Sequence, residues 1–142
     1  MKFSKLRYDE NDQQAKELMI KYFQNYGYSI ISEGENFEHD LIIEKEARKY
    51  FIEVEMKRSL LFTDSNSFKY DTVSFTSRKN KLHLLAPYTY YIIQPETEWA
   101  TYCHSSIIYQ EKYKVIKRNT DNEKEEFYHV PKQLCTFIDL KI

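Results

Sequence analysis

Acidic side chains gather within residues 40–59, which read DLIIEKEARKYFIEVEMKRS. The two apolar-rich halves of this segment predict two strands joined by a tight turn. Because side chains alternate along a strand, Glu53, Glu55 and Lys57 share one face of the second strand. Carboxylate oxygens suit Mg²⁺ or Mn²⁺, and a neighbouring lysine can orient water or stabilise negative charge. This combination of groups is suited to metal-dependent hydrolysis of a phosphodiester.

The register of the two strands decides which acid Asp40 faces. A turn centred on Glu46 and Ala47 places Asp40 opposite Glu53, whereas a turn centred one residue later places it opposite Glu55. Carboxylates at that separation repel each other unless a positive charge lies among them. A divalent cation would supply such a charge. Alternatively, the face is solvated, and Lys57 and its neighbour Arg58 neutralise the acids.

The remaining elements must hold this hairpin in place. A helix is predicted from Asp9 or Asn11, either of which can cap it, to about Tyr26, with Gly27 as a left-handed cap. Further strands are expected at residues 28–32, before a turn at Gly34, and at 72–75, 88–94, 101–110, 112–118 and 125–130. A second helix is expected at 77–86 after a Thr76 or Ser77 cap, and residues 133–140 fit a short helix or a strand. This order predicts an α/β or α+β fold with helices packed on a sheet.

Composition limits the classes of protein to which the chain can belong. Its 142 residues, 42% of them hydrophobic, predict a single compact domain over residues 1–142. The net charge of −1 means that any contact with nucleic acid needs a local basic patch. Two cysteines without a CxxC pair predict free thiols in a reducing compartment. With no apolar run long enough to span a membrane, we expect a location in the cytoplasm, that of the host if a phage encodes the protein.

The acids and the lysine of this hairpin resemble a known family. An acid opening one strand, followed after a hairpin by (D/E)-x-K at the end of the next, resembles the PD-(D/E)xK nuclease superfamily. Here these residues are Asp40 and then Glu55-Met56-Lys57, and the run IEVEMKRS resembles an E-V-E-x-K-x-S variant. The resemblance covers roughly residues 11–94. It implies a restriction-endonuclease-like central mixed sheet flanked by helices, to which the sequence adds a C-terminal β-hairpin.

The resemblance also implies roles for individual residues. Asp40 and Glu55 would bind Mg²⁺ or Mn²⁺, Lys57 would assist the attacking water, and Glu53 would be a further metal ligand. Glu53-x-Glu55 also fits an E-x-E variant, in which an acid replaces the motif lysine; we prefer Glu55-x-Lys57. His39 stands where the family usually has proline, and it could position a water, contact a phosphate or be a half-exposed strand end.

Four basic residues are candidates for DNA contact: Arg58, Arg78, Lys79 and Lys81. Three of them open the second predicted helix, where backbone and side chains commonly meet phosphate. The sequence thus predicts a metal-dependent DNA endonuclease, with a homodimer as a hypothesis for cutting both strands. The alternative is a non-catalytic module on the same fold that binds DNA or a protein.

Overall fold

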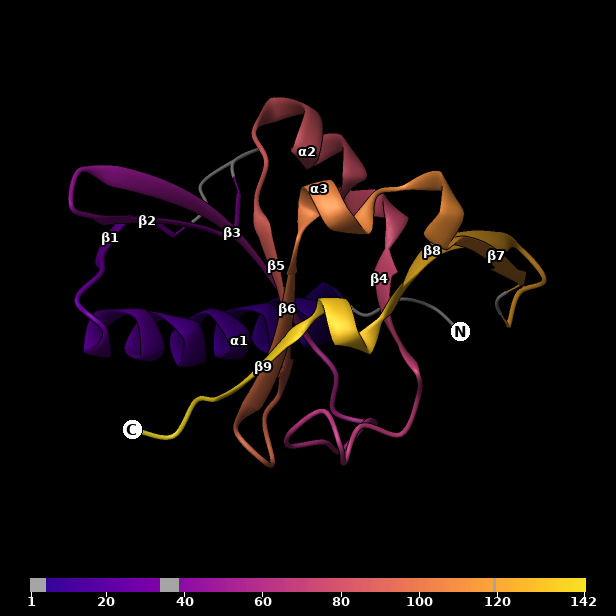
Figure 1. Ribbon diagram of the computed structural model, residues 1–142, viewed down its shortest axis with the longest axis horizontal. Coiled ribbons are helices and arrows are strands. Elements are labelled where there is room, and N and C mark those ends of the chain that lie inside the picture. Colours follow the sequence, from indigo (N-terminus) through magenta and orange to yellow (C-terminus); the bar gives the residue numbers. More distant parts are fainter. Residues whose placement is uncertain (1–4, 34–38, 119) are drawn as a thin grey trace.

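The computed structural model describes residues 5–33, 39–118 and 120–142, without the side chains of residues 5–12. Its larger sheet has six strands in the order β1-β2-β3-β5-β6-β9, and a smaller sheet has the order β4-β8-β7 (Figure 1). The large sheet comprises β1 (Ser29–Ser32), β2 (Leu41–Lys45), β3 (Arg48–Met56), β5 (Thr89–Gln94), β6 (Trp99–His104) and β9 (Thr136–Asp139). The small sheet comprises β4 (Thr72–Thr76), β7 (Lys114–Arg118) and β8 (Lys124–Pro131).

Helix α1 (Lys5–Asn25) covers one face of the large sheet. Its buried side chains are spaced at helical intervals: Ala15, Met19 and Phe23 are each at most 4% exposed. The helix is already formed at Lys5, so the predicted start at Asp9 or Asn11 was wrong. Gly27, with φ of 86°, follows the helix in the left-handed conformation that its sequence position predicts. The turn predicted at Gly34 lies outside the described residues.

The turn between β2 and β3 fixes the register of the acidic hairpin. Glu46 and Ala47 have φ of 53° and 65°, as two central residues of a type I′ turn require. Leu41 therefore pairs with Ile52, and continuing this register places Asp40 opposite Glu53. Of the two arrangements that the sequence left open, the structure has the first.

Strand β5 runs parallel to β3, so residues 57–88 form a crossover between them. This crossover carries β4, a 3₁₀ turn η1 (Ser77–Lys79) and the short helix α2 (Asn80–Leu85). From Tyr90 to Gln94 every residue of β5 is buried, because β5 lies in the middle of the sheet and both of its faces are covered. The second predicted helix is thus a 3₁₀ turn plus six residues, and α2 ends before Pro87 as expected.

The other face of the large sheet is covered mainly by the small sheet, not by helices as the sequence suggested. The predicted C-terminal hairpin is confirmed as β7 and β8, and β8 also pairs with β4. The strand expected through residue 110 stops at His104, whose side chain accepts from the backbone N–H of Ser106 and begins α3 (Ser105–Ile108). Residues 133–140 contain both predicted forms, since the turn η3 (Lys132–Leu134) precedes β9.

Alternate residues of the central strands therefore enter two cores. Tyr91 and Ile93 of β5 pack toward α1, whereas Tyr90 and Ile92 pack toward the small sheet. The fold is a mixed α+β arrangement with few helices. None of the helices in the described part of the chain is both long and apolar enough to cross a bilayer.

Candidate active site

A buried cluster joins the acidic hairpin to the crossover. The ammonium Nζ of Lys79 lies 3.1 Å from Asp40 Oδ2, 3.1 Å from Glu53 Oε1 and 3.1 Å from the backbone oxygen of Val54. Glu53 is 2% exposed and Lys79 is 6% exposed. The positive charge that the paired carboxylates require thus comes from Lys79, and the solvated-face alternative is wrong for Glu53.

Backbone hydrogen bonds hold the two carboxylates in this arrangement. The N–H of Asp40 donates to Glu53 Oε2 at 2.8 Å, and the N–H of Val54 donates to Asp40 Oδ2 at 3.0 Å. Each carboxylate therefore caps the neighbouring strand where the β2–β3 ladder ends. Both oxygens of Glu53 are engaged, whereas within the described residues the bonds to the Asp40 carboxylate all end at Oδ2.

The pKa values of the two carboxylates that share Lys79 are shifted in opposite directions. Burial raises the pKa of Glu53 to about 7, because the attraction of Lys79 is partly offset by repulsion from Asp40. Burial also opposes ionisation of Asp40, but the charge of Lys79 and the Val54 N–H outweigh it and lower the Asp40 pKa. Desolvation is likewise outweighed at Lys79, whose pKa is raised by Asp40 above all, so the ammonium stays charged.

Glu55 lies on the same face of β3, two residues further along. Tyr90 donates its hydroxyl to Glu55 Oε1 at 3.2 Å, and burial raises the Tyr90 pKa, so that this group remains a donor. The other oxygen, Oε2, is buried and has no hydrogen-bond partner among the residues that the structure describes. A buried acceptor without a partner is costly, which makes this oxygen a place for a water or a cation.

Lys57 contacts Ser74 and Glu55. Its Nζ donates to the backbone oxygen of Ser74 at 3.1 Å and lies 3.9 Å from Glu55 Oε2. The side chain is 30% exposed, so it borders the cluster without being enclosed by it. The preferred motif Glu55-x-Lys57 thus has its two members near each other, but Lys79 is the lysine that contacts Asp40 and Glu53.

His39 does not have the water-positioning or phosphate-binding geometry that its place beside Asp40 suggested. It is 5% exposed, its ring lies against Phe51 and Tyr88, and Nε2 is 3.2 Å from the oxygen of Ala86. The hydrogen bond connects the start of β2 to the end of α2. His39 therefore helps to fix the crossover against the hairpin, and the expectation of a half-exposed strand end was wrong.

The basic residues predicted to contact DNA do not form one surface patch. Lys79 is buried and bound to carboxylates, whereas Arg58, Arg78 and Lys81 are exposed. Arg58 donates to Gln14 of α1 and lies 3.7 Å from Glu96. The structure thus removes Lys79 from the predicted DNA-binding surface.

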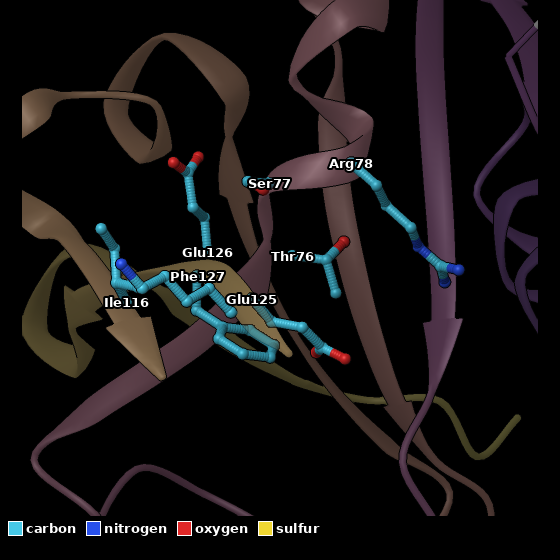
Figure 2. Close-up of a pocket in the computed structure, with 8 residues that line it drawn as sticks. Thr76, Ser77, Arg78, Ile116, Glu125, Glu126 and Phe127 are labelled. Carbon is cyan, nitrogen blue, oxygen red and sulfur yellow. The ribbon is translucent and has the colours of Figure 1, made fainter. Parts of the chain in front are cut away.

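Arg78 lines a pocket of mixed charge. This pocket, about 560 Å³ in volume, is bordered by Arg78 and Lys124 but also by Glu125 and Glu126. Figure 2 shows Arg78 and Glu126 on opposite sides of Thr76 and Ser77. Because acids balance the bases here, the pocket has no excess positive charge to attract a phosphate backbone.

Lys79 is the residue whose role sequence reasoning missed. It lies 39 positions after Asp40, and only the parallel crossover brings it to the hairpin. Arg78 and Lys81, close to it in the sequence, are exposed. The sequence alone does not distinguish the buried lysine from these two exposed basic residues. The usable signal was indirect: two carboxylates on one face of the hairpin require a cation, and "SRKNK" is the most basic short stretch of the crossover that follows.

Comparisons with known proteins do not assign this chain to a family. No protein-family model matches the sequence, and no curated protein matches it. Among the described residues, no three His, Cys, Asp or Glu side chains are grouped as the ligands of a metal. Mg²⁺ usually keeps several waters and needs only one or two protein carboxylates, and among the described residues no donor contacts Asp40 Oδ1 or Glu55 Oε2. Carboxylate oxygens are the type of ligand that Mg²⁺ and Mn²⁺ prefer.

Proposed function

We propose that this protein is a metal-dependent nuclease that hydrolyses phosphodiester bonds of DNA. The observation that carries the proposal is the buried Glu55 Oε2, which has no hydrogen-bond partner among the described residues and lies 3.9 Å from the ammonium of Lys57. The helix before the acidic hairpin and the mixed sheet also agree with the resemblance to PD-(D/E)xK nucleases.

The bound metal ion would polarise the phosphoryl oxygen and lower the pKa of a bound water. Asp40 and Glu55 would hold it, each through the oxygen that no donor among the described residues contacts. Lys79 keeps Asp40 ionised, as a ligand must be, and is itself anchored by Glu53. Glu53 thus supports the lysine and is not proposed as a metal ligand.

Two further residues complete the proposed site. Tyr90 fixes the orientation of Glu55 by donating to its other oxygen, as outer-shell partners of metal ligands do. Lys57, which is partly exposed and 3.9 Å from Glu55 Oε2, is placed to meet a phosphoryl oxygen of the substrate. The proposed set is therefore Asp40 and Glu55 as ligands, with Lys57 and Lys79 as the cations.

Cleavage of supercoiled plasmid and of single-stranded DNA tests this function, with Mg²⁺, Mn²⁺ or EDTA. We expect metal-dependent cleavage that falls by about 100-fold or more in Asp40→Asn and Glu55→Gln. Glu44→Gln is the matched control, since Glu44 lies on the same hairpin and faces Lys49 outside the cluster. Folding of each variant is checked by circular dichroism. Equal cleavage by Glu55→Gln and Glu44→Gln would contradict the assignment.

A non-catalytic binding module is the second candidate, and one observation favours it. Lys79 already neutralises much of the charge of Asp40 and Glu53, so the cluster is stable without any metal. Under this alternative, Mn²⁺ does not raise the melting temperature, whereas a metal-binding site gives a rise that Glu55→Gln abolishes. Binding to DNA without cleavage and without this thermal shift would favour the module.

A further inference from the structure

A second pocket, distinct from the one in Figure 2, is lined by residues of both sheets and by Lys57. It has a volume of about 440 Å³, within the range of small-ligand sites. Its walls come from β4, β5, β7 and β8 and from the segment after β3. The pocket and the candidate active site share Lys57, whose Nζ lies 3.9 Å from Glu55 Oε2.

Positive charge predominates in this pocket. Lys57, Lys117 and His129 line it, and Asp71 is the acid that borders it. His129 Nε2 is buried and has no hydrogen-bond partner within the described part of the chain. Burial lowers the pKa of His129, and the charges of Lys117 and Lys57 lower it further, which indicates that both ammonium groups act on the ring. An anion placed among these groups would gain from both lysines and could accept a hydrogen bond from His129.

The rest of the lining is aromatic and aliphatic. Leu60 and Phe68 form apolar wall, and Tyr70, which is 53% exposed, stands at the opening. Aromatic rings accept nucleic-acid bases by stacking, whatever the sequence. One pocket thus offers cations for a phosphate and apolar surface for a base.

We infer that this pocket receives one nucleotide unit of the nucleic-acid strand, with its phosphate against Lys57, Lys117 and His129 and its base toward Tyr70. The inference rests on the proposed nuclease function. Binding in this pocket would position the substrate for the proposed reaction, because a phosphate held by Lys57 places the adjoining part of the strand beside Glu55. The pocket of mixed charge around Arg78 lacks this excess of cations, which is why the strand is assigned here.

Binding of short oligonucleotides tests the inference without requiring cleavage. The Glu55→Gln protein in EDTA is titrated with a thymidine trinucleotide, with and without a 5′-phosphate, by calorimetry and by following the imidazole NMR signals of His129. We expect saturable binding that moves the His129 signals. Lys117→Ala and His129→Ala should each weaken it about 10-fold, as loss of one charged hydrogen bond does. Lys124→Ala, which removes a lysine from the other pocket, should leave it unchanged.

The outcomes distinguish a phosphate at a strand end from an internal phosphodiester, and they test the pocket and the nuclease function separately. Tighter binding of the 5′-phosphorylated form assigns the pocket to a strand end, and equal binding assigns it to an internal phosphodiester. No binding of either form, or equal weakening by Lys117→Ala and Lys124→Ala, overturns the inference. Lys117 is exposed, so its variant is expected to fold even where His129→Ala does not. Metal-dependent cleavage without this binding rejects the pocket alone, whereas binding without cleavage rejects the nuclease function alone.

Discussion

Lys79 carries one positive charge, while Asp40 and Glu53 would carry two negative charges if both were ionised. The lowered pKa of Asp40 and the raised pKa of Glu53 reflect this imbalance. Such coupled groups lose their protons as a pair, so the cluster holds close to one proton between its two acids at mildly acidic pH and loses it near pH 7. The charge of this buried site is therefore adjusted by protonation, and substitution of any member disturbs the others.

Removing the ammonium should destabilise the protein strongly. Lys79→Met keeps a similar volume but leaves two buried carboxylates without their cation, and breaking a buried pair in this way costs about 3–5 kcal/mol. Lys81→Met, two residues away and exposed, should change the free energy of unfolding by less than about 0.5 kcal/mol. Urea denaturation measures both. The double variant Lys79→Met/Glu53→Gln should recover part of the loss, and equal effects of the two single variants would contradict the buried cluster.

Stability should fall as pH rises from about 4.5 to about 7. Over this range native Glu53 keeps its proton, because its pKa is raised to about 7, while in the unfolded chain it ionises near 4.5. The native state then binds more protons, so the free energy of unfolding decreases, by roughly 2–3 kcal/mol. Asp40, whose pKa is lowered, works in the opposite sense: its contribution to stability is complete above about pH 3.8 and is lost as the pH falls further.

Urea melts across this pH range give the test. In Glu53→Gln the decrease between pH 4.5 and 7 should disappear, whereas in Glu44→Gln it should persist. A slope that is the same in wild type and Glu53→Gln would mean that Glu53 titrates normally.

The pairing of acids was predictable from the sequence, but the cation that bridges them was not. Alternation along the strand and two turn positions limited Asp40 to facing Glu53 or Glu55. Lys79 reaches the cluster by tertiary packing of the crossover, which no local pattern encodes. His39 illustrates the same limit, because its burial depends on Phe51 and Tyr88 from two other strands or segments.

At the scale of elements, the turn between β2 and β3 sets the geometry of the site. Glu46 and Ala47 both adopt positive φ, which is uncommon for residues with side chains. A shift of the turn by one residue would change which acid faces Asp40. This register, with Asp40 opposite Glu53, is therefore held by two turn residues in an unfavourable backbone conformation.

Substitution at this turn should change stability in opposite directions. Ala47→Gly relieves the left-handed conformation and should stabilise the protein by about 1 kcal/mol, whereas Ala47→Val should destabilise it, because a β-branched residue fits this conformation poorly. Thermal or urea unfolding measures both variants. Destabilisation by Ala47→Gly would show that the left-handed turn is not formed in solution.

Elements that local sequence patterns specify were predicted better than elements that depend on tertiary contacts. The hairpins β2–β3 and β7–β8 and the buried stripe of α1 follow from periodicity and turn residues. The end of β6 at His104 was missed, because the β-branched Ile107 and Ile108 suggest that the strand continues and the change to a helix depends on the His104 cap. The small sheet was missed as well, since β4 pairs with β8 more than 50 positions away.

At the scale of the whole molecule, the two cores should unfold together. Strand β5 contributes alternate residues to both, so neither core persists once this strand is lost. We expect Trp99 fluorescence, circular dichroism and thiol labelling of buried Cys103 and Cys135 to give coincident urea transitions. Labelling that precedes the fluorescence change would indicate that the side holding the cysteines opens by itself.

The parallel pairing of β3 and β5 also has a consequence for how fast the protein reaches this structure. Residues 57–88 must fold into a crossover before β3 and β5 can pair. Closing such a loop has an entropic cost that precedes any gain in free energy from the contacts. The β2–β3 hairpin closes through two residues and can form early. Wherever the hairpin forms before the crossover, its two acids face each other without Lys79, and their repulsion weakens the hairpin until Lys79 reaches them.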